Sequence, residues 1–323
     1  MSASPRVVAL GGGHGLAASL RALRLVTGQL TAIVTVADDG GSSGRLRDEI
    51  GALPPGDLRM ALTSLAGADP HSQTWAKLLQ HRFRSTGPLD GHAVGNVVLA
   101  GLEQLVGDPV TALRLVGELV SSAGCVLPMS VEPLDIVADV VGLDAADPGA
   151  VVEVQGQVAV ATTPGRVIGV RLVPQQPAAC PDALTAVKQA DWVVFGPGSW
   201  FTSVLPHLLV PDLAASLLDT AGRRLVVLNL VPQPGETSGF SPETHLEVLA
   251  AHAPDLRLDV VLADSSAVTD VDPLRLTAEA LGAELVIAPV SAEGPAPVHH
   301  PQRLAAAYRT IMCSDSQQAP GSE

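Results

Sequence analysis

The sequence predicts an α/β fold in which helices cover both faces of a mostly parallel sheet. Short apolar runs rich in Val, Ile and Leu alternate with segments of helical periodicity along the 323 residues. Hydrophobic residues make up 47% of the chain but aromatic residues only 2%, so the core must be built from Leu, Val and Ala, which suits buried parallel strands. Glycine-rich turns follow two of the apolar runs. The predicted fold is therefore Rossmann-like.

The charge and the cysteine content restrict the class of ligand and the compartment. The chain has 19 Lys and Arg residues against 33 Asp and Glu residues, a formal net charge of −14. Such an acidic surface disfavours nucleic acid and anionic membranes, so we expect a small phosphorylated ligand held by arginines and backbone amides. Cys125, Cys180 and Cys313 are too few and too scattered for a disulfide framework or a cysteine zinc site. Without a leader peptide or an apolar run of bilayer length, we expect a cytoplasmic protein with no membrane insertion.

The first strand, expected at residues 7–10, leads into a glycine turn and then a helix, because Leu16, Leu20 and Leu23 recur at helical spacing. A helix start has free N–H groups and a dipole that favours anions, and glycines let a diphosphate approach the backbone closely. The pattern is G-x-G-x-G, and Leu16 stands where the last glycine of the dinucleotide fingerprint should be. A tight turn with no ligand is the alternative. The candidate phosphate-binding residues are Gly11, Gly12, Gly13, His14 and Gly15.

A second strand, expected at residues 30–36, ends in two carboxylates and a Gly/Ser segment. Asp38 and Asp39 lie where open α/β sheets bind ligands, so they could accept sugar hydroxyls or, with Asp57, hold Mg²⁺. Serine hydroxyls, free amides and an arginine fork behind them suit a phosphate. An ordinary loop with a capping aspartate, and Asp57 as a helix N-cap, are the alternatives. The further candidates here are Gly40, Gly41, Ser42, Ser43 and Arg45.

Three more polar residues are candidates from their places at helix starts. Arg59 is in the first turn of a predicted helix, where a cation is unfavourable for the helix dipole unless it contacts a ligand or solvent. Asn96 is one of only two asparagines in the chain and is poorly suited to a helix interior. His92 precedes it in a polar turn. For both, a purely structural role is the alternative.

A β-rich segment separates the two halves of the predicted sheet. Residues 134–141, 151–161 and 167–173 are short β-branched runs interrupted by Gly, Pro and Asp. We interpret residues 130–173 as an antiparallel insertion without visible ligand chemistry. The chain is then one Rossmann-like domain over residues 1–313, followed by a polar, disordered tail at 314–323.

A second glycine turn repeats the logic of the first. Residues 192–195 predict a buried strand that ends in Gly196 and Gly198, and hydroxyl side chains precede the next helix. This is no G-x-S-x-G nucleophile elbow, because Trp200 and Phe201 follow the serine. Asn229, near the end of another strand at 224–230, could hydrogen-bond to a base or a sugar. The other candidates in this half are Ser199, Thr202, Ser203, Gln233, Glu236 and Thr237.

The end of the chain predicts the remaining elements. Strands are expected at 258–263 and 284–289, and helices at 273–282 and 301–312. His299 and His300 precede the last helix without other metal ligands at a suitable spacing, so we expect them at the surface or at the mouth of the ligand site.

Five of these blocks together resemble one family over nearly the whole chain, the YvcK-like gluconeogenesis factors of the CofD-like superfamily. The blocks are residues 11–15, 36–47, 91–96, 196–203 and 233–237. The resemblance implies a Rossmann-like protein that binds UDP-N-acetylglucosamine and acts in cell-envelope homeostasis, cell morphogenesis and growth on gluconeogenic carbon sources. The resemblance implies no demonstrated reaction. It also implies a cell-division or cell-wall protein as a partner. Self-association into a homo-oligomer is left open.

Two other functions remain as alternatives. The related CofD-type enzymes are phospholactate transferases of deazaflavin coenzyme biosynthesis that use a nucleotide-activated donor and Mg²⁺; Asp38, Asp39 and Asp57 would then hold the metal, but no general base stands out. An NAD(P) enzyme is suggested by the first strand and opposed by the missing fingerprint glycine. The chain departs from the family in having Val298, His299 and His300 where a basic residue often stands beside a His-Asp pair.

Overall fold

The computed structural model describes residues 4–294 and 296–313 and is built around one parallel sheet. Within these residues the sheet has seven strands in the order β10-β9-β8-β7-β1-β2-β3, all paired in parallel. The strands are β1 (Arg6–Gly11), β2 (Gln29–Val34), β3 (Cys125–Pro128), β7 (Trp192–Phe195), β8 (Arg223–Val227), β9 (Val260–Asp264) and β10 (Glu284–Ala288). The α/β, Rossmann-like prediction is confirmed.

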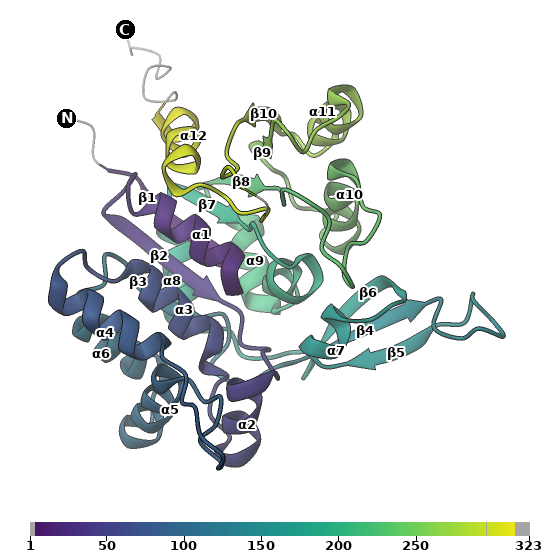
Figure 1. Ribbon diagram of the computed structural model, residues 1–323. Helices are drawn as coiled ribbons and strands as arrows, with labels where there is room; N and C mark the ends of the chain where they lie inside the picture. The colour runs from purple at the N-terminus through teal and green to yellow at the C-terminus, as the bar shows by residue number, and fades with distance from the viewer. Residues whose placement is uncertain (1–3, 295, 314–323) are drawn as a thin grey trace, which may run out of the picture.

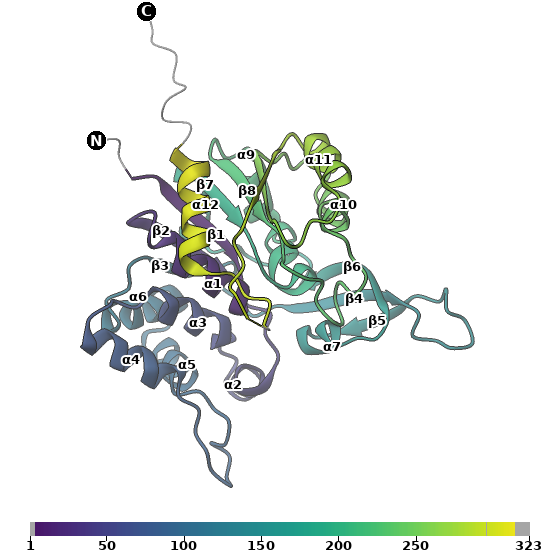
Figure 2. The ribbon, with the colours of Figure 1, turned by 45° about the horizontal axis from the view of Figure 1, so that its top comes forward.

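Helices cover both faces of this sheet. The helix α1 packs against α3 and α12 over one face, and α8 packs with α9 over the other (Figures 1 and 2). The helices are α1 (Gly13–Leu23), α2 (Gly41–Ile50), α3 (Pro55–Leu65), α4 (Pro70–Gln80), α5 (Val94–Val106), α6 (Pro109–Leu119), α8 (Pro181–Gln189), α9 (Pro211–Asp219), α10 (Pro242–His252), α11 (Val271–Ala280) and α12 (Pro301–Cys313), with the short η1 (Trp200–Val204) and η2 (Leu205–Leu208).

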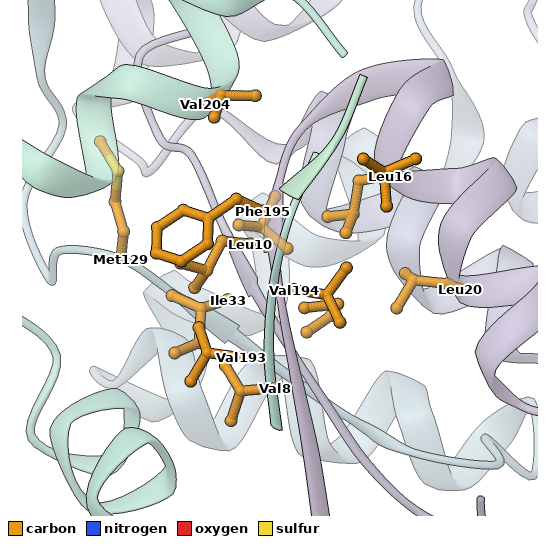
Figure 3. Close-up of a cluster of buried hydrophobic side chains, with 14 of the residues drawn as sticks. Val8, Leu10, Leu16, Leu20, Ile33, Met129, Val193, Val194, Phe195 and Val204 are labelled. Atoms are coloured by element: carbon orange, nitrogen blue, oxygen red, sulfur yellow. The ribbon is translucent and has the colours of Figure 1, made fainter. Parts of the chain in front are cut away.

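The core is aliphatic, as the composition predicts. Side chains of β1 and β7 alternate between the two faces of the sheet: Val194 lies on the side of Leu16 and Leu20 from α1, whereas Leu10 and Phe195 lie on the other (Figure 3). All of these side chains are almost completely buried. Because the two central strands are covered on both faces, their carboxyl ends are held rigidly next to each other.

The insertion forms a separate small sheet, as predicted, but one of its segments differs from the prediction. It consists of β4 (Asp135–Val141), β5 (Val152–Gln155) and β6 (Arg166–Val173) in the antiparallel order β5-β4-β6. Residues 151–161 do not form one strand, because β5 ends at Gln155, Gly156 adopts a positive φ of 99°, and the helix α7 (Gln157–Ala161) follows. The small sheet projects from the body of the molecule (Figure 1).

Two further predictions concern the C-terminal tail and membrane insertion. The disordered tail predicted at 314–323 lies outside the described residues. In the described part of the chain, no single helix is long and apolar enough to cross a membrane, and one pair, Trp200–Leu208 with Pro211–Asp219, passes that test only when joined across a 75° bend.

Candidate functional site

The two glycine turns meet at one rim of the sheet. The chain builds outward from β1 to β3 in one direction and from β7 to β10 in the other, so β1 and β7 lie side by side where the strand order reverses. Open α/β sheets bind ligands at this point, beyond the carboxyl ends of the strands. Gly15 packs so closely on the second turn that a Cβ on it would lie 2.5 Å from Cα of Gly198 and closer still to the carbonyl of Pro197.

A cavity of about 410 Å³ opens between these turns. Its walls are the first glycine turn, residues 197–199 of the second turn, residues 229–234 after β8, and residues 297–299 before α12. Asp57 of α3, Ser203 of η1 and Gln157 of α7 complete it. The volume suits a small molecule, and the walls combine backbone amides with polar side chains and the carboxyl group of Asp57.

A larger cavity of about 960 Å³ lies at the opposite end of the central strands. Its lining includes Arg6, Gln29 and Cys125, which begin β1, β2 and β3. The carboxyl ends of the strands, with their free helix-start amides, are at the other rim. We therefore place the candidate site in the smaller cavity.

Asn229 holds the second glycine turn in place. Its Oδ1 accepts a hydrogen bond from the Gly198 amide at 3.0 Å, and its Nδ2 donates to the Gly198 carbonyl at 2.9 Å. The side-chain donor and acceptor of Asn229, which the sequence suggests could bind a base, thus both bond to the backbone of Gly198. Asn229 still lines the cavity, and its contact with a ligand stays a prediction.

Glu236, Thr202 and Thr237 lie behind the second turn, outside the lining of the cavity. The Glu236 carboxylate accepts hydrogen bonds from the Thr202 hydroxyl at 2.5 Å and from the Phe201 amide at 3.3 Å. Burial raises the pKa of Glu236. Thr237 accepts a hydrogen bond from the Gln233 amide at 2.8 Å. These contacts attach the loop after β8 to the start of η1, so the loop and the second turn form one unit.

A buried charged group lies beneath the first glycine turn. Burial together with the charge of Asp38 raises the pKa of Asp57 to about 7, and the nearby backbone amide of Gly13 lowers it by less. Arg59, whose side chain is only 4% exposed, has a pKa lowered to about 10, mainly by burial and then by Arg82. Among the described residues, Asp57 Oδ2 and Arg59 Nε and Nη1 have no hydrogen-bond partner. These unpaired buried atoms favour a polar or ionic function for the rim.

The predicted serine, histidine and asparagine candidates contact one another. Ser42 Oγ is 3.0 Å from His92 Nδ1 and accepts a hydrogen bond from Asn96 Nδ2 at 3.0 Å. Ser43 Oγ accepts from the Gly56 amide at 3.0 Å. All four side chains are buried and connect α2 to the starts of α3 and α5. They lie outside the cavity lining, and their contact with a ligand stays a prediction.

The loop after β2 is also outside the lining of the cavity. Asp39 Oδ1 accepts a hydrogen bond from the Val158 amide of the insertion at 3.0 Å. Arg45 donates to the carbonyls of Pro88 and Asp90 at 3.2 and 2.7 Å. The structure thus brings together at the cavity Gly12, Gly13, His14, Gly15, Gly198, Ser199, Ser203, Asn229 and Gln233 with Asp57. Outside the cavity lining are Gly11, Gly40, Gly41, Arg59, Gly196 and Asp38.

The carboxylates fit a divalent cation only in part. Asp38 and Asp57 are close enough to interact electrostatically, and Asp57 Oδ2 is an unpaired buried acceptor. Asp39 instead faces the insertion. In the part of the chain that the structure describes, no three His, Cys, Asp or Glu side chains gather as a metal site. Asp38 and Asp57 are thus the two residues that could hold Mg²⁺, which prefers few carboxylates and retains water.

Two residues of the cavity wall are indicated weakly or not at all by the sequence as ligand-site residues. His299 lines the cavity, and burial lowers its pKa to about 4. Gln157 lines it from the insertion, where no ligand chemistry is visible in the sequence. A single neutral glutamine in a β-rich segment offers no pattern from which such a place could be predicted.

The fold and this rim define a doubly wound α/β protein whose cleft lies at the switch point of its sheet. The chain belongs to the CofD family, since residues 7–286 match the family model described as 2-phospho-L-lactate transferase CofD. It is 53% identical over 312 residues to a protein of Mycobacterium tuberculosis, covering 96% of this chain and 91% of that protein.

Two further relatives carry the name gluconeogenesis factor. The protein from Listeria monocytogenes is 36% identical, and the match covers 82% of this chain and 79% of that protein. The protein from Bacillus subtilis is 34% identical, and the match covers 84% of this chain and 82% of that protein. A crystal structure of a UPF0052 family member from Bacillus halodurans has a TM-score of 0.83 and 31% identity, covering 95% of this chain and 99% of that one. The resemblance drawn from the sequence motifs is confirmed.

Proposed function

We propose that the protein is a regulatory protein that binds UDP-N-acetylglucosamine in the cavity between the two glycine turns. One observation carries the proposal: Gly15 packs against Gly198 at the switch point of the sheet, with a cavity beside both turns. Backbone amides at a helix start, reached without hindrance from side chains, are a recurrent diphosphate site. A nucleotide sugar has a diphosphate at its centre and uncharged polar groups at both ends, which matches the walls of the cavity.

The first turn of α1 supplies the amides for the diphosphate. The amide of Gly13 lies near Asp57, and the amides of His14 and Gly15 have no intrahelical acceptor, so we assign these two to the ligand. Ser199 and Ser203 face the same cavity from the second turn. We expect Asp38 at the hydroxyl groups of the ligand and Asn229, in the loop at 229–234, near its uracil.

The biological role that we propose follows the relatives. The names of the Listeria monocytogenes and Bacillus subtilis proteins connect this family to gluconeogenesis. We propose that binding reports the supply of cell-wall precursor to a cytoplasmic cell-division or cell-wall partner, in cell morphogenesis and during growth on gluconeogenic carbon sources. The binding step would then regulate without converting the ligand.

Calorimetry of the purified protein tests the binding step. We expect a saturable heat with UDP-N-acetylglucosamine and weaker or no binding of GDP, GTP and NADH under the same conditions. Saturable binding of one of those nucleotides, with no heat from UDP-N-acetylglucosamine, would overturn the proposal.

The second candidate function is a CofD-like transferase, favoured by the Asp38–Asp57 pair and by the description of the matching family model. Mg²⁺ bound there would neutralise charge on the phosphates of a nucleotide-activated donor. The chain itself would hold the donor on its glycine turns and exclude water with the loop at 229–234. Metal-dependent turnover of such a donor with a deazaflavin acceptor would establish this function. Binding of UDP-N-acetylglucosamine without turnover would favour the regulatory protein.

A further inference from the structure

The helix α7 of the insertion contacts two loops of the rim, one at each end. On one side, Asp39 accepts the hydrogen bond from the Val158 amide, and a Cβ on Gly156 would collide with the other carboxylate oxygen of Asp39. On the other side, a Cβ on Gly235 would collide with the carbonyl of Ala161. Both ends of α7 are therefore in close contact with loops that follow β2 and β8. Such contacts fix the position of the helix on the body of the protein.

These contacts at the two ends of α7 position Gln157 at the cavity. Gln157 is the first residue of α7 and lines the cavity together with the two glycine turns. No hydrogen bond engages its side-chain amide within the described residues, whereas Gln155, two residues earlier, donates to Asp135 at 3.4 Å. Gln157 is half-buried, so its side-chain amide has donors and an acceptor available at the wall of the cavity.

We propose that Gln157 is a ligand-contacting residue that recognises an uncharged polar group of the bound molecule, and that Asp39 positions it through α7. The proposal rests on the proposed function and extends it to a part of the chain outside the sheet. A neutral amide has both donor and acceptor atoms, so it pairs with hydroxyl or acetamido groups and adds no charge for a phosphate. A nucleotide sugar provides such groups next to its diphosphate.

The first test compares the affinity of three proteins for UDP-N-acetylglucosamine by calorimetry: wild type, Gln157→Ala and Gln155→Ala. One neutral hydrogen bond predicts a loss of about two- to tenfold in affinity for Gln157→Ala. The control Gln155→Ala, an exposed residue outside the cavity lining, should keep the wild-type affinity. Equal affinities of wild type and Gln157→Ala, with unchanged thermal unfolding, would overturn the inference.

A double-mutant cycle tests the positioning role of Asp39. If Asp39 acts only by holding α7, then Asp39→Ala weakens binding in the wild-type background and has no further effect in the Gln157→Ala background. Asp39→Asn retains an acceptor for the Val158 amide and should restore most of the affinity. Additive losses from Asp39→Ala and Gln157→Ala would mean that Asp39 contacts the ligand itself, and would contradict the positioning role.

Failure of the proposed function and failure of the Gln157 contact give different calorimetric results. If wild type gives no heat with UDP-N-acetylglucosamine, the proposed ligand is wrong, and the same three proteins are compared with whichever of UDP, GDP, GTP or NADH saturates the wild type. A loss of binding confined to Gln157→Ala then supports the contact made by Gln157. Identical binding by all three proteins overturns it.

Discussion

At the scale of single residues, the close packing of Gly15 is the feature on which the rim depends most. The substitution Gly15→Ala places a Cβ 2.5 Å from Cα of Gly198 and nearer to the Pro197 carbonyl, so the turns must separate. Overpacking of this kind costs about 1–3 kcal/mol of stability. We expect at least a tenfold loss of affinity for UDP-N-acetylglucosamine, measured by calorimetry, together with a lower unfolding temperature.

Gly28→Ala is the matched control for this prediction. Gly28 has open space around its Cβ position and lies in the short connection between α1 and β2, so an alanine there should change neither property. Gly15→Ala with wild-type affinity would show that the contact between the two turns does not shape the binding site.

The residue scale also shows what the sequence could and could not predict about the site. The glycine turns were predictable, because several glycines between a buried strand and a helix are typical of a phosphate-binding turn. The hydrogen-bond partners of Ser42, Asn96 and Asn229 were not predictable. Each is a polar residue near a helix start or a strand end, but whether its side chain meets a ligand or a neighbouring segment depends on contacts between distant positions of the chain. Gly198 and Asn229 are 31 positions apart, and Ser42 and Asn96 are 54 apart.

At the scale of elements, Glu236 joins the loop after β8 to the start of η1. Glu236→Ala leaves the Phe201 amide and the Thr202 hydroxyl unpaired in a buried place, which we expect to cost about 1–3 kcal/mol for each unsatisfied group. Glu236→Gln keeps a carbonyl acceptor and should lose less. Urea unfolding measures both, with Glu247→Ala at an exposed position of α10 as control. Equal losses for the alanine and glutamine variants would contradict the role of the acceptor.

His207 connects η2 to the sheet and gives the protein a specific pH dependence. It is fully buried, its ring nitrogens face the carbonyls of Ile33 and Val204, and burial lowers its pKa from 6.5 to about 4. Below pH 6.5 the unfolded chain takes up a proton that the folded protein does not, so stability falls as the pH drops from 6.5 to 4. The loss attributable to this residue is about 3 kcal/mol at pH 4.

The measurement is the free energy of unfolding between pH 7 and pH 4 for wild type, His207→Gln and His71→Gln. Glutamine does not titrate, so His207→Gln should lose stability less steeply with acid than wild type, whatever its stability at pH 7. His71 is exposed, and His71→Gln should follow the wild-type slope. Parallel slopes for all three proteins would mean that His207 does not stay neutral in the folded state.

Elements of the large sheet were more predictable than those of the insertion. Strands such as β7 and β9 of the large sheet are buried along their whole length, so short runs of Val, Leu and Ile indicate them directly. In the insertion, the apolar run at 151–161 fits a strand by composition, but Gly156 and the contact of Asp39 with Val158 turn its second half into α7. That contact spans 119 positions and leaves no local pattern.

At the scale of the whole molecule, the order of the strands converts two distant turns into one site. Each turn by itself is a strand followed by glycines, and the sequence places them about 180 residues apart. General rules for doubly wound sheets predict that the first strands of the two halves become neighbours. The pairing of β1 with β7 confirms this expectation. Side chains that close the cavity from outside the sheet, such as Gln157, follow no such rule.

The net charge of −14 affects how an anionic ligand reaches this site. The local amides attract phosphate over a short range, whereas the repulsion by the whole molecule acts over the Debye length, about 30 Å at 0.01 M salt and about 8 Å at 0.15 M. Added KCl therefore removes mainly the repulsion. We expect the association rate constant of UDP-N-acetylglucosamine, measured by stopped flow, to rise a few-fold over this range. Sucrose at equal osmolality should give no rise, and an association rate that falls with KCl would mean that positive potential at the rim dominates the approach of the ligand.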